Sequence, residues 1–247
     1  MDTDTHRIFG VPVECRSRKG VESIIRETLG GKRFRRIATA NPEFFVRARR
    51  DACFRENLLA ADYRIADGFG IVLDGFLSGK KIVRYPGADL LSFVLSEAER
   101  SQSSAFLLVR NDGLSTLPEV IRAIRARYTR LVVDGETLDP KSIIVPDAAR
   151  RATVVLCNFG APEQEYALES FRKDPGNIRL AMGVGGSFDF LTGRRKRAPE
   201  RMRTVGLEWF FRLLVQPRRI GRIWTATVVF PFLRLSDRIK SVSIQER

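Results

Sequence analysis

The feature that most limits the fold of this chain is its alternation of short apolar segments with amphipathic ones, which continues to about residue 190. Segments such as 153–157 and 179–182 are short and almost wholly apolar, which is typical of buried strands. Segment 20–29 has apolar residues three and four positions apart, which is typical of a helix. Strands that alternate with helices favour an α/β, Rossmann-like sandwich with a largely parallel sheet.

The same patterns predict the individual elements. We expect strands over residues 7–13, 36–40, 63–66, 105–109, 131–133, 153–157 and 179–182. We expect helices over residues 20–29, 42–59, 88–100, 117–128 and 162–171. Asn41 is a suitable N-cap for the second helix, and Pro42 occupies the first helical position, where the missing N–H costs nothing.

The net charge of +14 is concentrated at the C-terminal end. Residues 194–247 hold 14 Lys and Arg against 4 Asp and Glu, so they carry +10 and the rest of the chain only +4. We therefore expect an α/β catalytic domain over 1–193 and a basic appendage over 194–247. A charge gathered in one segment favours contact with phosphate, lipid head groups or nucleic acid.

The appendage also has an apolar pattern. Leu207, Phe210, Phe211 and Leu214 fall on one face of a helix, and Pro217 is expected to end or kink that helix. Residues 220–240 mix aromatic and basic side chains and are interrupted at Pro231. The appendage is thus predicted to be basic, amphipathic and helical, which suits a lipid interface better than a nucleic acid.

Several kinds of chemistry are disfavoured. His6 is the one histidine, so catalysis by a histidine base and histidine-ligated metal sites are poor explanations. The three cysteines are widely spaced and form neither a zinc motif nor a disulfide framework. The polar start lacks the pattern of a signal peptide, and no apolar run is long enough to cross a bilayer, so a cytoplasmic protein is expected.

Polar clusters follow three of the predicted strands. Thr39 and Asn41 stand at the end of one strand, Asp67 and Gly68 follow the next, and residues 160–165 follow a later one. In parallel α/β sheets, ligands bind beyond the carboxyl ends of strands. These clusters are therefore expected to line one ligand site.

Read in order, the clusters belong to a longer series of motifs. The series is Gly10-Val-Pro-Val, Thr39-Ala-Asn-Pro, Asp67-Gly-Phe-Gly-Ile-Val, Arg84-Tyr-Pro-Gly-Ala-Asp-Leu, Gly160-Ala-Pro-Glu-Gln-Glu, Gly183-Val-Gly-Gly-Ser-Phe-Asp, Arg197-Ala-Pro, Gly206-Leu-Glu-Trp-Phe-Phe-Arg and Gln216-Pro-Arg-Arg. Over residues 8–222 the chain thereby resembles the WecG/TagA/CpsF family, glycosyltransferase family 26. It departs from that pattern at Glu163, where the family has lysine, and in residues 109–113 and 131–138, so the donor sugar is left open.

The resemblance implies an enzyme, a hexosyltransferase, and names its partners. A sugar, N-acetylmannosamine-like or another hexose, would pass from a UDP-sugar to a polyprenyl-diphosphate-linked sugar, with inversion, in cell-surface polysaccharide biosynthesis. No metal and no other cofactor are implied. The resemblance also implies peripheral attachment to an anionic membrane surface, on its inner face, through the appendage. Homo-oligomerisation is left open.

Asp67 is expected to be the catalytic carboxylate. Inverting transfer needs a base that takes the proton of the attacking hydroxyl, and the resemblance places that role on Asp67. The structural alternative is an Asp-Gly turn in which the side chain only caps the backbone.

Other residues are expected to bind substrate. Thr39 and Asn41 stand at a strand end, where they can hydrogen-bond substrate hydroxyls, and the amide of Gln164 can hold a sugar or uracil. Gly185 and Gly186 can let the backbone approach the diphosphate closely. Arg84 is similar to a family arginine that is proposed to contact substrate phosphate or sugar. For Asn41 the alternative is helix capping, and for Arg84 it is a solvated arginine.

Arginines of the appendage are expected to bind the departing diphosphate. The resemblance gives this role to Arg212, Arg219 and Arg222, and guanidinium groups suit phosphate oxygens. The alternative for these arginines is attraction to lipid head groups. The basic run 194–197 is expected to serve the membrane or the polyprenyl diphosphate. Two other functions remain for the chain as a whole: a basic nucleic-acid-binding protein, and a non-catalytic relative of the family.

Overall fold

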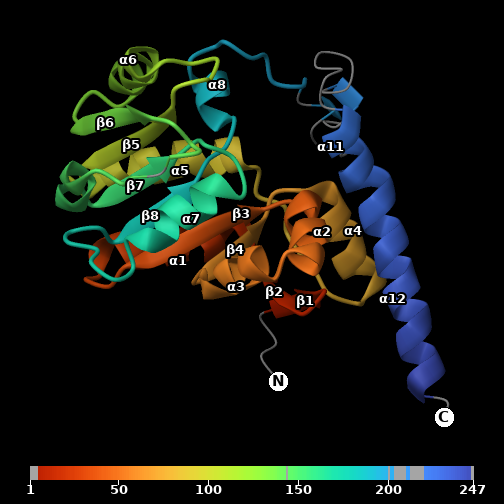
Figure 1. Cartoon of the computed structure of the whole chain (residues 1–247). Coiled ribbons are helices and arrows are strands. Elements are labelled where there is room, and N and C mark those ends of the chain that lie inside the picture. The colour runs from red at the N-terminus through yellow and green to blue at the C-terminus, as the bar shows by residue number, and fades with distance from the viewer. Residues whose placement is uncertain (1–4, 143, 200, 203–209, 212–219, 246–247) are drawn as a thin grey trace.

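The computed structural model describes residues 5–142, 144–199, 201–202, 210–211 and 220–245. Its centre is a six-stranded sheet in the order β4-β3-β8-β7-β5-β6, and every neighbouring pair is parallel (Figure 1). The strands are β3 (Arg35–Ala40), β4 (Tyr63–Ala66), β5 (Ala105–Arg110), β6 (Val133–Leu138), β7 (Val154–Cys157) and β8 (Leu180–Gly183). The predicted α/β fold with a largely parallel sheet is confirmed.

Helices cover both faces of this sheet (Figure 1). One face packs against α1 (Arg18–Gly30), α5 (Gly87–Arg100), α6 (Leu117–Arg127) and α8 (Ser187–Leu191). The other packs against α2 (Pro42–Arg50), α3 (Ala52–Ala60), α7 (Glu163–Ser170) and the short η1 (Asp147–Arg151). Successive strand residues enter opposite cores, as Phe106 and Leu107 do, because side chains alternate along a strand. This double burial explains the continuous apolar runs.

The predicted strand over residues 7–13 is wrong. The segment is a hairpin, β1 (Thr5–Ile8) with β2 (Val11–Glu14), outside the main sheet. Phe9 and Gly10 form its turn with φ values of 49° and 82°. A two-residue hairpin turn with two positive φ values matches the twist of the strands that it joins.

The single helix predicted over residues 42–59 is also wrong, because it is broken at Asp51. Asp51 has φ −123° and ψ 101°, which is not helical, and its side chain accepts a hydrogen bond from the Phe54 N–H at 3.0 Å. An aspartate side chain that caps a following turn competes with helix continuation. Two helices, α2 and α3, result.

Two further elements differ from the sequence prediction. The strand expected over 131–133 starts at Val133 and continues through polar residues to Leu138. It is an edge strand, where a polar outer surface is ordinary, and it passes so close to β5 that a Cβ on Gly135 would lie 2.6 Å from the Leu107 carbonyl oxygen. Helix α4 (Phe69–Leu77) was not predicted, because its apolar residues are not confined to one face.

A long helical segment runs along one side of the α/β domain (Figure 1). It consists of α11 (Ile220–Trp224), the π-helical turn η3 (Thr225–Val229) and α12 (Phe230–Gln245), which contacts α2 and α4. Pro231 does not end this segment, and the π-helical turn η3 that stands directly before α12 is the kind of irregularity that accompanies a proline within a helix. The helix expected around 207–214 and its end at Pro217 lie largely outside the described residues. None of the described helices is long and apolar enough to cross a membrane.

Asp74 on α4 fastens this segment to the domain. Its carboxylate is 4% exposed and lies 2.8 Å from His6 Nε2, 2.8 Å from Arg234 Nε and 2.9 Å from Arg238 Nη2. Hydrogen bonds from His6 and Arg234 outweigh burial and lower the pKa of Asp74 to about 2. One carboxylate thus joins the N-terminal hairpin, α4 and α12.

Candidate active site

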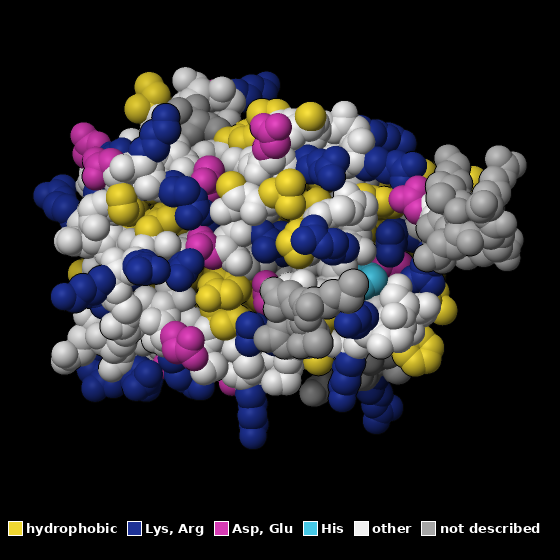
Figure 2. Space-filling view, turned by 90° about the horizontal axis from the view of Figure 1, so that it is seen from below, with side chains coloured by type: hydrophobic (Ala, Val, Ile, Leu, Met, Phe, Trp, Pro, Cys, Tyr) yellow, Lys and Arg dark blue, Asp and Glu magenta, His cyan; other side chains and the backbone are white. Residues whose placement is uncertain are grey.

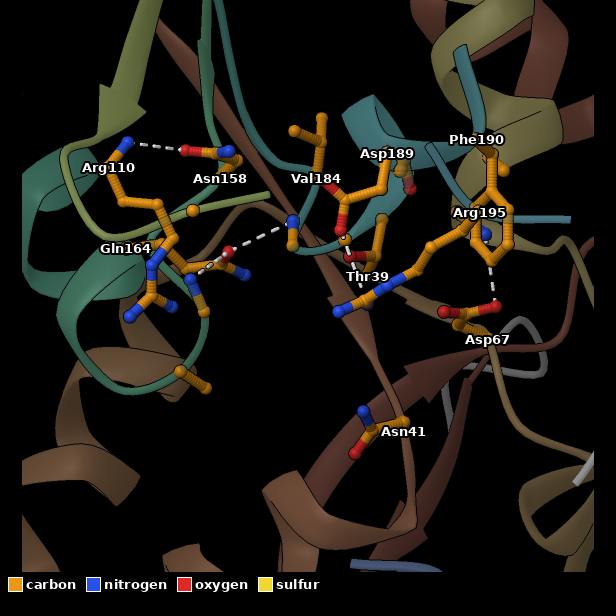
Figure 3. Close-up of a pocket in the computed structure, with 18 of the residues that line it drawn as sticks. Thr39, Asn41, Asp67, Arg110, Asn158, Gln164, Val184, Asp189, Phe190 and Arg195 are labelled. Atoms are coloured by element: carbon orange, nitrogen blue, oxygen red, sulfur yellow. Dashed lines mark hydrogen bonds and ion pairs between the residues drawn. The ribbon is translucent and has the colours of Figure 1, made fainter. Parts of the chain in front are cut away.

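A cavity of about 380 Å³ opens beyond the carboxyl ends of the central strands. It takes residues from the ends of β4, β3, β8, β7 and β5, and the side chains in Figure 3 come from those connections. This is where parallel α/β sheets bind ligands, and the volume is within the range of small-molecule sites. The polar strand-end clusters meet here, as the sequence predicted.

Asp67 lies at the end of the cavity beyond β4. Its Oδ1 accepts a hydrogen bond from the Gly87 N–H at 3.0 Å, and its own N–H donates to the Ala40 carbonyl at 2.8 Å. The Gly87 hydrogen bond fixes the orientation of the carboxylate at the N-terminus of α5. The Asp67 side chain therefore accepts a backbone hydrogen bond and also lines the cavity.

Thr39 and Asn41 lie beside Asp67 on the same wall (Figure 3). The Thr39 hydroxyl donates to the Gly183 carbonyl at 2.9 Å, which links the ends of β3 and β8. Asn41 Oδ1 accepts a hydrogen bond from the Phe44 N–H at 3.3 Å, so the capping role of Asn41 is confirmed. Substrate contact by either residue remains a prediction.

Glycine turns form the middle of the cavity wall. Gly160 follows β7, and Gly185 and Gly186 follow β8. Gly160 and Gly185 have φ values of +85° and +47°, a backbone conformation that favours glycine. Gln164 lies between the two turns and is 3% exposed, so little of its amide is open to the cavity.

Of the three arginines expected to bind diphosphate, Arg222 lines the cavity and pairs with Glu43 at 2.7 Å. Arg212 and Arg219 lie outside the described residues. Arg84 is half-buried and donates to the backbone carbonyl of Asp67 at 3.4 Å. Arg84 is not among the residues that line this cavity.

Two further arginines of the cavity lining, Arg195 and Arg197, come from the basic run 194–197. Arg195 pairs with Asp189 at 3.2 Å, and Arg197 pairs with Asp89 at 2.6 Å. In Figure 3 the Arg195 side chain extends between Asp189 and Asp67. The run 194–197 was expected to serve the membrane or the polyprenyl diphosphate, and the position of Arg195 and Arg197 in the cavity favours the second of these roles for the two residues.

At the other end of the cavity lies Arg110, at the tip of β5. Its guanidinium contacts both carboxylate oxygens of Asp112, at 2.6 and 2.8 Å, and donates to the Phe159 carbonyl at 2.8 Å. The Asp112 contact raises the pKa of Arg110. Asn158 Oδ1 accepts a hydrogen bond from the Arg110 backbone N–H at 2.8 Å.

A second cavity of about 410 Å³ shares Arg110 and continues toward β6. From the sequence, Arg110 and Asp112 were noted only as part of residues 109–113, where the chain departs from the family pattern.

This arrangement combines a carboxylate with several guanidinium groups around one cavity. A carboxylate can accept a proton from a hydroxyl, and guanidinium groups can hold phosphate oxygens. Within the described part of the chain, no group of three or more His, Cys, Asp and Glu side chains is placed to hold a metal ion. The carboxylate and the guanidinium groups can together support proton transfer beside an anionic group.

Comparison with known proteins identifies the family. The model for the "Glycosyl transferase WecG/TagA/CpsF family" matches residues 6–243. The chain is similar to the N-acetylglucosaminyldiphosphoundecaprenol N-acetyl-beta-D-mannosaminyltransferase of Bacillus spizizenii, with 31% identity over 192 residues that cover 76% of this chain and 74% of the relative. The Bacillus subtilis protein of the same name is 28% identical over 192 residues, with the same shares covered. The chain belongs to the WecG/TagA/CpsF family of glycosyltransferases.

Proposed function

We propose that this chain is an inverting glycosyltransferase that moves a hexose, N-acetylmannosamine or a close relative, from a UDP-sugar to a polyprenyl-diphosphate-linked sugar. The reaction would serve cell-surface polysaccharide biosynthesis. The observation that carries the proposal is the position of Asp67, a carboxylate held at a strand end in the same cavity as Arg195, Arg197 and Arg222. The names of the two Bacillus relatives supply the substrate class.

In the proposed step, the acceptor hydroxyl oxygen attacks the anomeric carbon of the donor sugar from the side opposite the diphosphate. Asp67 takes the hydroxyl proton as the new C–O bond forms. The bond from the anomeric carbon to the diphosphate oxygen breaks, and UDP leaves with the electron pair. Arg222 and Arg195 stabilise the charge that develops on the leaving phosphate, with Arg212 and Arg219 proposed to assist. Because arginines neutralise that charge, transfer is expected to persist in EDTA.

A donor screen tests the proposal. UDP-sugars are offered together with a short-chain prenyl-diphosphate N-acetylglucosamine, and products are identified by mass spectrometry. The expected result is a prenyl-linked disaccharide and free UDP with one donor, N-acetylmannosamine or a related hexose, in the presence of EDTA. Failure of every donor, from a folded protein presented with lipid-linked acceptor, would instead favour a non-catalytic relative.

We also propose that the protein lies on the inner, anionic surface of the cell membrane. Large apolar side chains are exposed on α4 (Phe69, Leu73, Phe76, Leu77) and on α11 to α12 (Trp224, Val228, Phe232, Leu235). The two groups meet in a groove lined by Leu73, Leu77 and Leu235. Exposed Lys80 and Lys81 follow α4, and Figure 2 shows Lys and Arg spread over the underside of the molecule. Apolar surface edged by cations suits an anionic lipid interface.

Flotation with liposomes tests the membrane proposal. Phe76 is 77% exposed, so Phe76→Asp together with Leu77→Asp should leave the fold intact and lower binding to anionic liposomes about tenfold or more, because apolar burial in the lipid is lost. Val132→Asp is the matched control, since Val132 is 70% exposed beside β6, at the opposite edge of the sheet. Tight binding to oligonucleotides with no binding to liposomes would contradict the proposal.

A further inference from the structure

The Gln164 side chain joins the two glycine turns of the site. Its Oε1 accepts one hydrogen bond from the Gly160 N–H at 3.1 Å and another from the Gly185 N–H at 3.2 Å. A backbone N–H can only donate, so the atom facing both glycines has to be the amide oxygen. The Nε2 group therefore points the other way, 3.0 Å from Glu165 Oε1.

Glu165 is in turn held by a buried arginine from the sheet. Its Oε2 accepts from Arg36 Nη1 at 2.6 Å, and both side chains are fully buried. Arg36 projects from β3, pairs with Glu169 at 2.8 Å and donates to the Asn57 carbonyl. A charge-assisted chain thus runs from the centre of the sheet through Glu165 to the amide of Gln164.

The Gln164 amide packs closely against the end of β8. A Cβ on Gly183 would lie 2.3 Å from Gln164 Nε2 and 2.9 Å from Glu165 Oε1, so the strand end is closely packed against the amide. Gly160 and Gly185, by contrast, can adopt many backbone conformations, because glycine lacks a Cβ. Backbone hydrogen bonds hold parts of these turns, such as the Gln164 N–H to the Gly160 carbonyl at 2.8 Å, and the Gln164 side-chain oxygen adds a contact that the two turns share.

We propose that Gln164 is a positioning residue: its amide oxygen holds the Gly160 and Gly185 turns in register across the cavity, and Glu165 and Arg36 fix the direction of that amide. Gln164 would then act on the substrate through the two turns and not by contact of its own amide. This differs from the direct substrate contact that is expected for the Gln164 amide from the sequence.

Exchanging the two side chains tests the proposal. In Gln164→Glu, a carboxylate oxygen replaces the amide nitrogen that donates to Glu165. The two carboxylates repel each other, and the hydrogen bonds from residue 164 to Gly160 and Gly185 are expected to be lost. Displacing groups that hold the substrate by about 1 Å lowers kcat/KM on the order of 10²-fold. A loss of that size in kcat/KM is expected for Gln164→Glu, and it should appear as a raised KM for the donor. In Gln164→Glu with Glu165→Gln, donor and acceptor are restored in reverse order: the negative charge moves to position 164, and an amide oxygen at position 165 can still accept from Arg36. Recovery to within about tenfold of the parent is expected. If Gln164 contacts substrate through its amide nitrogen, the double variant stays as defective as Gln164→Glu.

The activity measurement rests on the proposed function, so a second measurement uses the protein alone. Hydrogen exchange of the Gly160 and Gly185 amides, followed by NMR, should be at least tenfold faster in Gln164→Met than in the parent. Val120→Ala on α6 is the control, because Val120 is fully buried elsewhere and its truncation lowers stability without touching the turns. Unchanged exchange at both glycines in folded Gln164→Met would overturn the proposal, whatever the enzyme assay shows.

Discussion

Asparagine in place of Asp67 is expected to lower sugar transfer about 10²–10⁴-fold, the range that follows loss of a general base. An amide cannot take the proton of the attacking hydroxyl at neutral pH. The Asn side-chain oxygen can still accept the Gly87 N–H that Asp67 accepts at 3.0 Å, so the turn should persist. Turnover is measured as UDP release with the donor and acceptor found in the screen, and circular dichroism checks the fold.

Asp112→Asn is the matched control for Asp67→Asn. Asp112 lines the same cavity, but its carboxylate is occupied by Arg110 at 2.6 Å, on the β5 side of the cavity. Loss of a solvent-exposed ion pair of this kind is worth up to about 1 kcal/mol, so less than about tenfold should be lost. If folded Asp67→Asn turns over within a factor of ten of the parent, Asp67 is not the base.

Removal of the Asp74 carboxylate is expected to lower the stability of the protein substantially. Asp74→Ala leaves His6, Arg234 and Arg238 without the buried acceptor that they share. Hydrogen bonds to charged groups contribute about 1.5–3 kcal/mol, and a loss of that size in the free energy of unfolding is expected. Helix α12 should separate from α4 first. Urea unfolding and limited proteolysis of α12 measure the two effects.

The pH dependence of the free energy of unfolding distinguishes the contribution of the Asp74 carboxylate from other contributions to stability. The folded-state pKa is about 2, below the ordinary value of 3.8, so the folded protein binds the proton less readily than the unfolded chain. The contribution is therefore fully present above about pH 4 and is lost as the pH falls toward 2. The difference in stability between the parent and Asp74→Ala should shrink over that interval.

Asp237→Asn on the same helix is the control for Asp74. Asp237 pairs with Arg49 at 2.7 Å, but both side chains are about one-third exposed. Exposed pairs contribute up to about 1 kcal/mol, so this variant should keep α12 in place. A loss as large in Asp237→Asn as in Asp74→Ala would contradict a special role for the Asp74 cluster.

The sheet could be predicted from the sequence because parallel strands are buried on both faces and therefore read as apolar runs. The prediction was wrong where local turn and capping interactions, and not the apolar pattern, determined the backbone conformation. A turn with two positive φ values made a hairpin of residues 5–14, and the Asp51 cap divided a helix. Helix α4 was missed because large apolar side chains such as Phe76 remain exposed on it, so no polar face marks its pattern.

The site was partly predictable for a similar reason. Polar residues at the ends of parallel strands necessarily gather at one edge of the sheet, so the common location of Thr39, Asp67 and Gly185 followed from their positions in the sequence. The pairing of Arg195 with Asp189 depends on how the chain returns after α8, which no local pattern records. The contacts of Gln164 were hidden too, because Gly185 lies 21 residues away.

Because His6 stands near one end of the chain and Arg234 and Arg238 near the other, the Asp74 carboxylate makes the two ends energetically dependent on each other. A deletion that removes His6, or one that removes Arg234 and Arg238, takes hydrogen-bond partners away from the same buried carboxylate, Asp74. The losses in free energy of unfolding caused by deletions at the two ends should therefore not be additive. The second deletion removes partners from an ion-pair cluster that the first deletion has already weakened.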